Sequence, residues 1–257
     1  MDFLSGKHVV TVNLHSQSAL MNEVRGRLRD GAGFALATLN LDHLVKLRGN
    51  PAFRKAYAAQ NLVVADGNPV VWLSHLAGGR VSLVTGSDMV LPLCVVAAEQ
   101  GVTVALLGST QTALDRAAAV LEAQVEGLRI VARIAPPMGF DPEGAEAARL
   151  LEDVAASGAR LCLLALGAPK QEILAARGRE IAPHVGFASI GAGLDFIAGT
   201  QRRAPLWIRR LALEWLWRLA VSPARLAPRY ARCFAILPSA TLAALRHRRD
   251  PRNLPPA

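Results

Sequence analysis

Leu161-Cys162-Leu163-Leu164-Ala165-Leu166 runs directly into Gly167-Ala168-Pro169-Lys170-Gln171-Glu172, and this stretch decides the fold. The first six residues are all apolar, which is typical of a strand buried on both faces of a parallel sheet. The next six contain Gly, Pro, Lys, Gln and Glu, which indicates a turn followed by the start of a helix. A buried strand that enters a helix through a polar turn is the repeating unit of α/β proteins.

The same unit recurs along most of the 257-residue chain. Short apolar segments alternate with longer stretches of helical periodicity. This alternation predicts an α/β, Rossmann-like fold, a mostly parallel sheet with helices on both faces. The expected strands are residues 9–14, 34–39, 62–65, 102–107, 128–134, 161–166 and 185–190. The expected helices are residues 18–29, 51–60, 69–76, 88–100, 110–125, 143–156 and 169–181.

The composition changes near residue 200. Residues 202–252 contain 12 Arg, no Lys and two acids, a net charge of +10, whereas the remainder has 17 basic and 18 acidic residues. The high pI of about 10.4 therefore describes one segment and not the whole chain. We expect an α/β core at 1–200, a basic helical C-terminal appendage at 201–250 and a short tail at 251–257.

The expected appendage interleaves arginine with tryptophan and leucine. Apolar residues recur at helical spacing at Ile208, Leu211, Trp215 and Leu219. A basic amphipathic helix that carries Trp is typical of a segment that lies on an anionic membrane surface. The candidate membrane-docking residues are Arg209, Arg210, Trp217 and Arg218. The alternative is that the apolar face packs on the core while the arginines are solvated.

Composition also sets expectations about location. No apolar run approaches the roughly 18–20 residues that a membrane-spanning helix needs. The first residues lack the basic and then apolar pattern of a signal peptide. Cys94, Cys162 and Cys233 lie far apart in apolar surroundings, which favours reduced core thiols. The expected location is cytoplasmic, with peripheral attachment to the inner face of the cell membrane.

Five of the expected strands end in polar or glycine-rich segments. Ligands of open parallel sheets bind beyond the carboxyl ends of the strands. If the sheet order brings these ends together, they line one crevice. The five segments are residues 38–40, 66–69, 108–110, 167–172 and 191–195.

Asp66 is the candidate general base. It follows the apolar segment Leu62-Val63-Val64-Ala65 and precedes Gly67, which places its carboxylate at the edge of the sheet. Burial at that edge would raise its pKa and make it a usable base. An aspartate that merely shapes a turn is the alternative. Asp195 follows a glycine-rich turn in a similar way, and a structural anchor is the alternative for it.

Two strand ends suit a phosphate group. Gly108-Ser109 precedes an expected helix, whose first N–H groups lack partners within the helix. Lys170 adds a positive charge beside Pro169, a residue that fits the first helical position. Simple helix capping is the alternative for the Gly108-Ser109 segment.

Several known site types are missing from the sequence. It contains no Asp-x-Asp pair for a nucleotide-bound metal ion and no His/Cys cluster with zinc spacing. It also lacks a P-loop, a Gly-x-Gly-x-x-Gly after the first strand and a Gly-x-Ser-x-Gly elbow. These absences argue against P-loop enzymes, dinucleotide oxidoreductases and serine hydrolases. We expect neither a metal ion nor a cofactor.

Taken together, the motifs resemble those of the WecG/TagA/CpsF family of bacterial glycosyltransferases. The resemblance runs in order from about residue 9 to about residue 234, nearly the whole chain. The matching segments are Thr38-Leu39-Asn40, Ala65-Asp66-Gly67, Thr85-Gly86-Ser87-Asp88, Leu107-Gly108, Gly167-Ala168-Pro169-Lys170-Gln171-Glu172, Gly191-Ala192-Gly193-Leu194-Asp195-Phe196, Arg203-Ala204-Pro205, Leu213-Glu214-Trp215-Leu216-Trp217-Arg218-Leu219 and Pro223-Ala224-Arg225-Leu226.

The resemblance implies a metal-independent, inverting transfer of a sugar, such as N-acetylmannosamine, from a UDP-sugar to a polyprenyl-diphosphate-linked sugar. Such reactions build cell-surface polysaccharides. It makes Asp66 the base, places Thr38, Asn40 and Gln171 in the pocket, and makes the appendage a membrane-docking element. It also allows self-association into a homo-oligomer. The full set of expected substrate-binding residues is Thr38, Asn40, Gly67, Gly108, Ser109, Lys170, Gln171, Glu172, Asp195 and Arg203.

One position departs from the family pattern. Many members carry an arginine just before the Val-Thr-Gly segment, where this chain has Leu83. If that arginine holds diphosphate in the family, another cation must do so here. Arg203 is one alternative.

Two other classes of protein compete with a transferase. A basic nucleic-acid-binding protein would explain the arginines, but aromatic residues make up 5% of the chain and the Trp/Leu pattern serves no purpose on nucleic acid. We therefore expect no nucleic-acid partner. A non-catalytic nucleotide-sugar-binding module on the same fold is the second competitor. The presence of both Asp66 and Gln171 argues against it.

Overall fold

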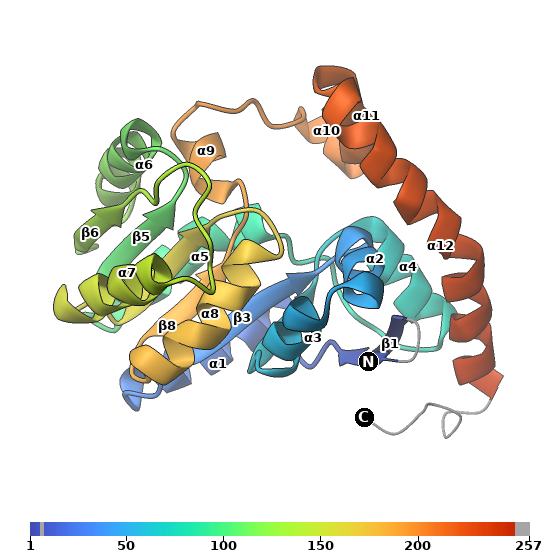
Figure 1. Ribbon diagram of the computed structural model, residues 1–257, viewed down its shortest axis with the longest axis horizontal. Helices are drawn as coiled ribbons and strands as arrows, with labels where there is room; N and C mark the ends of the chain where they lie inside the picture. Colours follow the sequence, from blue (N-terminus) through green and yellow to red (C-terminus); the bar gives the residue numbers. More distant parts are fainter. Residues whose placement is uncertain (6–7, 250–257) are drawn as a thin grey trace.

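The computed structural model describes residues 1–5 and 8–249, so Asp250 and the expected tail at 251–257 lie outside the described residues. Its centre is a six-stranded, all-parallel sheet with the order β4-β3-β8-β7-β5-β6 (Figure 1). The fold class expected from the sequence is confirmed. The strands are β3 (Phe34–Leu39), β4 (Leu62–Ala65), β5 (Val104–Gly108), β6 (Ile130–Ile134), β7 (Leu161–Ala165) and β8 (Gly186–Ser189).

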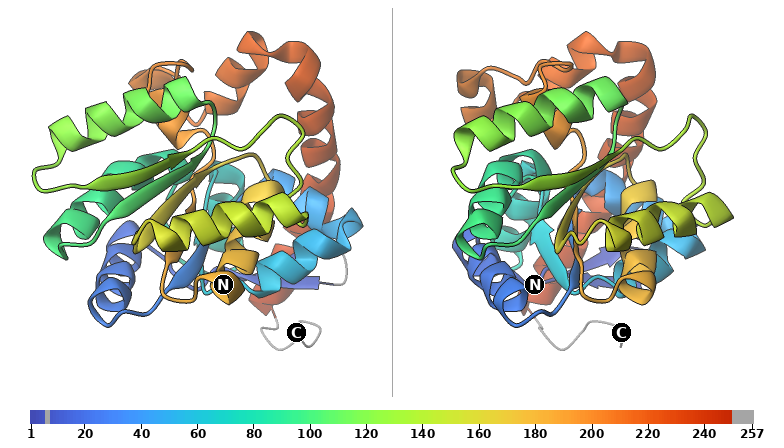
Figure 2. Two further views of the ribbon diagram at one scale, coloured as in Figure 1. Left: turned by 60° about the vertical axis from the view of Figure 1, so that its left-hand side comes forward. Right: turned by 90° about the vertical axis from the view of Figure 1, so that its left-hand side faces the viewer.

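Helices cover both faces of the sheet because successive strand residues point to opposite sides. In β3, Phe34 and Leu36 pack with α1, α5, α6 and α9, whereas Ala35 packs with α7 and α8 on the other face. Figure 2 shows helices on both sides of the sheet. The helices before the appendage are α1 (Gln17–Arg29), α2 (Leu41–Gly49), α3 (Pro51–Ala58), α4 (Asn68–Leu76), α5 (Gly86–Glu99), α6 (Gln111–Gln124), α7 (Ala145–Ala156), α8 (Lys170–Ile181) and α9 (Gly193–Ile197).

Two features at the start of the chain differ from the sequence expectation. The first expected strand, residues 9–14, was wrong in its extent and partner, because β2 (His8–Thr11) pairs with β1 (Asp2–Ser5) in a separate antiparallel hairpin. Helix α2 was not expected. It begins directly after β3, with Asn40 as its N-cap, so only Asn40 separates the strand from the helix in the sequence.

The appendage consists of α10 (Leu206–Arg210), α11 (Glu214–Val221) and α12 (Pro223–Arg249). The expectation of one amphipathic helix through Ile208 and Leu219 was wrong, because the chain turns between α10 and α11. Ala212 adopts a positive φ of 60° in that turn. In Figure 1, α10 and α11 lie beyond one end of the core, and α12 runs back along α2 and α4.

Candidate functional site

The five polar strand ends lie along one edge of the sheet. Strands β4, β3, β8, β7 and β5 are consecutive in the sheet and all parallel, so their carboxyl ends face the same way. The condition set by the sequence, that the strand order should bring these ends together, is met. This edge is where open α/β sheets bind ligands.

Asp66 stands at this edge, immediately after β4. Its backbone N–H donates to the carbonyl of Leu39 at the end of β3, with an N···O distance of 2.7 Å. Gly67 follows with a φ of 103°, a conformation that glycine adopts without strain, and it is the N-cap residue of α4. The sharp turn leaves the Asp66 side chain partly buried, neither in the core nor free in solvent.

The surroundings of Asp66 suit a proton acceptor. Burial, reinforced by the negative charge of Glu214, raises the pKa of Asp66 from 3.8 to about 6. The positive charge of Arg218 and hydrogen bonds from the side chains of Thr38 and Asn40 limit that rise in pKa. An acid with a pKa near 6 is ionised at neutral pH and still basic enough to accept a proton.

Thr38 and Asn40 are held in place independently of any ligand. Thr38 is the buried fifth residue of β3. The Asn40 side-chain oxygen accepts a hydrogen bond from the backbone N–H of His43 at 3.0 Å and so caps α2. The amide nitrogen of Asn40 is then free to serve Asp66. The structure therefore brings together Thr38, Asn40 and Asp66, as the sequence indicated.

Two appendage residues act on the same carboxylate, and the sequence analysis assigned neither of them this place. Both Glu214 and Arg218 belong to α11, and both contribute to the pKa of Asp66. Helix α11 thus lies close enough to the sheet edge to set its electrostatics. A signal was present in the sequence, since Glu214 is the one acid between residues 202 and 249.

Arg203 ties this part of the appendage to the core. Its Nη2 donates to Asp88 Oδ2 at 2.9 Å, and its Nε lies 4.0 Å from Glu214 Oε1. Hydrogen bonding by Arg203 lowers the pKa of Asp88. Arg203 was expected to hold substrate phosphate, but here its charge is shared between two carboxylates. Asp88 Oδ2 also accepts a hydrogen bond from the hydroxyl of Thr85, with an O···O distance of 2.7 Å.

At the end of β5, Gly108 and Ser109 form a tight turn. A Cβ at Gly108 would collide with the carbonyl of Ala165 in β7, and Gly108 has a φ of 122°. The backbone N–H of Ser109 donates to that same carbonyl at 3.0 Å. Thr110 caps α6 with its hydroxyl. Capping and close strand packing therefore account for the local conformation, and phosphate binding by Gly108 and Ser109 stays a prediction.

Asp195 anchors the loop that leads towards the appendage. Its Oδ1 accepts the hydroxyl of Ser109 at 2.6 Å, and its Oδ2 accepts the amide of Gln201 at 3.1 Å. Thr200 also donates to Asp195 Oδ1, at 3.2 Å. These contacts agree with the structural anchor that the sequence offered as the alternative for Asp195. A substrate contact by Asp195 stays a prediction.

Gln171 and Glu172 lie beneath the edge and not on its surface. Gln171 is 4% exposed, and its amide donates to Glu172 Oε1 at 2.8 Å while its oxygen accepts the N–H of Gly191 at 3.1 Å. Glu172 is fully buried, and burial raises its pKa to about 7. His43 Nε2 lies 3.9 Å from Glu172 Oε1. These contacts brace the loop after β8 from below.

The ammonium group of Lys170 points away from Gln171. Its Nζ donates to the backbone carbonyl of Phe140, in the loop between β6 and α7, and lies 6.0 Å from the centre of the Phe140 ring. Leu83, which stands where many family members have an arginine, is exposed. Nearby, Val84 donates from its backbone to Ala65 at the end of β4. Position 83 itself therefore supplies no positive charge in this chain.

The four residues expected to dock on a membrane are placed differently from one another. Arg210 is exposed, whereas Arg209 lies 3.8 Å from Asp88 and Arg218 faces the site. Trp217 is partly buried. The most exposed apolar residues of α10, α11 and the turn between them are Leu206, Trp207, Leu211 and Val221. Within the described part of the chain, no helix combines the length and the apolarity needed to cross a membrane.

Among residues 1–5 and 8–249, no three His, Cys, Asp or Glu side chains gather as a metal site. The three cysteines are buried and unpaired by disulfides.

The model of the glycosyl transferase WecG/TagA/CpsF family matches residues 7–253. This match covers nearly the whole chain, so the protein belongs to that family and is a glycosyltransferase.

Proposed function

We propose that this glycosyltransferase moves a sugar from a UDP-sugar to a polyprenyl-diphosphate-linked sugar, with inversion at the anomeric carbon and without a metal ion. The product would be an intermediate of a cell-surface polysaccharide. The single observation that carries the proposal is the setting of Asp66. A partly buried carboxylate with a pKa of about 6 stands beside Thr38 and Asn40 at the ligand-binding edge of the sheet.

In the proposed reaction, an acceptor hydroxyl attacks the anomeric carbon from the face opposite UDP. Its proton passes to the Asp66 carboxylate as the new carbon–oxygen bond forms. The bond from the anomeric carbon to UDP breaks, and UDP leaves with the electron pair. A positioned base of this kind contributes about 10²–10⁴-fold to the rate.

The departing UDP needs positive charge nearby. Arg218 in α11 is a candidate for this role, because its positive charge already acts on the pKa of Asp66. Arg203 could turn from Asp88 towards a diphosphate, since both partners of its present ion pairs are partly exposed. Fixed cations and helix N-termini stabilise developing negative charge more effectively in a site that excludes water.

The appendage gives a route to a lipid-linked acceptor. We propose that the exposed residues Leu206, Trp207, Leu211 and Val221 insert at the interface of an anionic membrane, while Arg210 contacts its headgroups. Each arginine near an anionic leaflet contributes roughly 1 kcal/mol. Because the α11 residues Glu214 and Arg218 also act on the charge of Asp66, docking of the appendage would bring the acceptor towards the site. This arrangement fits a peripheral protein on the inner face of the cell membrane.

A donor screen tests the proposal. The purified chain would be incubated with a panel of UDP-sugars and a short-chain prenyl-diphosphate-linked sugar, with and without a chelator. We expect one UDP-sugar to give a glycosylated lipid and stoichiometric UDP, at a rate that the chelator does not change. Transfer that needs an added divalent metal, or a retained anomeric configuration in the product, would contradict the proposed mechanism.

A further inference from the structure

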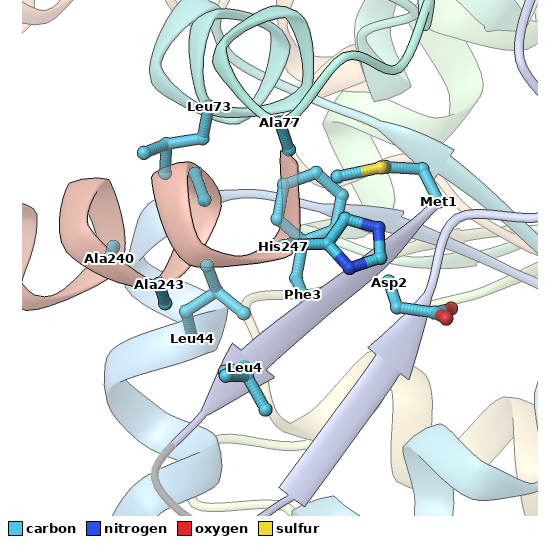
Figure 3. A pocket seen from close by; sticks show the side chains of 11 residues that line it. Met1, Asp2, Phe3, Leu4, Leu44, Leu73, Ala77, Ala240, Ala243 and His247 are labelled. Atoms are coloured by element: carbon cyan, nitrogen blue, oxygen red, sulfur yellow. The ribbon is translucent and has the colours of Figure 1, made fainter. Parts of the chain in front are cut away.

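Helix α12 is anchored on the core over much of its length. It packs against α2, α4 and β1. Near its C-terminal end, Ala240, Ala243 and His247 face Phe3, Leu44, Leu73 of α4 and Ala77, the C-cap residue of α4 (Figure 3). These contacts are apolar and leave room for a small cavity, so they are not the most specific part of the interface. That part lies nearer the start of the helix.

A buried carboxylate joins α12 to α2. Asp42, in the first turn of α2, has a side chain that is 8% exposed. Its Oδ2 lies 2.7 Å from Lys46 Nζ, one turn further along α2, and 3.2 Å from Arg229 Nη2 of α12. A buried carboxylate requires compensation, and here one cation comes from the core and the other from the appendage.

Lys46 extends the chain of contacts to the loop between β7 and α8. Its Nζ also donates to the backbone carbonyl of Ala168, at 2.8 Å. Ala168 lies just before Lys170 and Gln171, and Gln171 braces Gly191. Four groups therefore connect the appendage to a loop at the carboxyl edge of the sheet: the Arg229 guanidinium, the Asp42 carboxylate, the Lys46 ammonium and the Ala168 carbonyl.

We propose that Asp42 and Lys46 couple the seating of α12 to the position of the loop at residues 167–171. With α12 in place, Arg229 neutralises part of the Asp42 charge and leaves Lys46 free to share its protons with Ala168. When Arg229 leaves, Lys46 is the remaining cation beside a buried carboxylate and is drawn fully to it. The Ala168 carbonyl then loses its donor, and the loop loosens. The appendage thus orders the loop at residues 167–171 through this chain of contacts.

The chain carries its own probe for the release of α12. Cys233 lies one turn after Arg229 and is 6% exposed beneath the helix, whereas Cys94 and Cys162 are fully buried in the core. Alkylation of Cys233 therefore reports opening of α12, and alkylation of Cys94 or Cys162 reports global unfolding. Peptide mass spectrometry separates the three sites. Amide hydrogen exchange over residues 167–174 reports the loop in the same samples.

The test compares three variants of the full chain. Arg229→Met keeps the length of the side chain and removes its charge, and Arg229→Lys restores a cation. Arg232→Met is the matched control, because Arg232 is exposed on the same helix and its Nε donates to Pro228 within that helix.

We expect Arg229→Met to raise both the rate of Cys233 alkylation and the amide exchange of the loop by about tenfold. Arg229→Lys should restore most of the protection at both places, and Arg232→Met should change neither.

Exposed Cys233 with unchanged exchange in the loop would overturn the coupling and leave Arg229 as an anchor alone. Unchanged Cys233 would overturn the anchor as well. Alkylation of Cys94 in Arg229→Met would point to unfolding, and Asp42→Asn would then have to loosen the loop while leaving Cys94 protected for the coupling to stand. Neither measurement uses sugar or lipid, so the outcome is separate from that of the proposed reaction.

Discussion

The carboxyl edge of the sheet and the C-terminal appendage differ in what they leave exposed. At the edge, Thr38, Gln171 and Glu172 are all buried. In the appendage, apolar side chains face solvent, and of the sixteen exposed large hydrophobic residues among those described, ten lie between residues 206 and 245. A monomeric soluble surface rarely gathers exposed apolar groups in this way. This difference supports the proposal that the edge is the reaction site and the appendage the docking surface.

The two regions also divide the charge. The core is close to neutral, whereas the appendage contributes the excess arginine. Where they meet, the appendage arginines pair with core acids: Arg203 with Asp88, and Arg229 with Asp42. The appendage therefore has arginines of two kinds, those that pair with acids of the core and those that face solvent.

The largest effect is expected at the edge. Asp66→Asn keeps the size of the side chain but removes the base, so transfer should fall by at least about 10²-fold. The raised pKa means that ionised Asp66 lowers the free energy of unfolding above pH 6, and we expect the variant to be at least as stable as the wild type at pH 8. Turnover and thermal denaturation would be measured together. The control is Asp30→Asn, since Asp30 is exposed at the opposite edge of the sheet.

Removal of the appendage tests the other region. A chain that ends at residue 201 should no longer sediment with vesicles that contain anionic lipid, because the exposed apolar residues and the arginines are gone. The full chain should bind, and less so at high salt. Retained binding by the truncated chain would place the docking surface on the core. Circular dichroism of the truncated chain would establish that the core still folds.

A single tryptophan sharpens the comparison. Trp207 in α10 and Trp72 in α4 are exposed to similar extents, 62% and 57%. Trp207→Ala should weaken vesicle binding by about fivefold, as expected for losing roughly 1 kcal/mol of apolar burial. Trp72→Ala should leave binding unchanged. Equal losses in the two variants would mean that the docking surface extends over the core.

The last effect is on stability and not on function, and it concerns Glu172 in the brace beneath the edge. Burial raises the pKa of Glu172 from 4.5 to about 7, so the folded state binds this proton more tightly than the unfolded state. The free energy of unfolding should therefore fall as pH rises from about 4.5 to about 7. Glu172→Gln should remove that decline and be more stable at pH 8 by about 1–3 kcal/mol. Urea denaturation across this pH range measures it, with exposed Glu152→Gln as the control.

Much of the core was predictable from the sequence, because its elements depend on local pattern. Most of the six sheet strands are apolar runs bounded by turn residues, and the predicted bounds of all six lie within a few residues of the observed ones. Asp66 was identifiable because it ends such a run. The hairpin was not, since β2 resembles a sheet strand until its partner β1 is known. Strand order was also beyond the sequence, because the pairing of β3 with β8 joins residues far apart in the chain.

The appendage was less predictable for a physical reason. Its residues satisfy helical periodicity through Leu211, and nothing local marks Ala212 as a residue with positive φ. The effect of Glu214 on the pKa of Asp66 and the ion pair of Arg229 with Asp42 depend on how two separate parts pack. Charge alone indicated a surface segment, and it did not indicate which arginines face Asp88 or Asp42.

The pH dependence of kcat/KM for transfer tests the central claim most directly. If Asp66 is the base, kcat/KM should rise about tenfold per pH unit below pH 6 and level off above it, in the wild type and in Glu172→Gln alike. The Glu172→Gln variant tests whether Glu172, whose pKa is also raised, is instead the source of the acidic limb of the profile. A profile that is flat from pH 5 to pH 8, or one whose acidic limb disappears with Glu172, would contradict the assignment of Asp66.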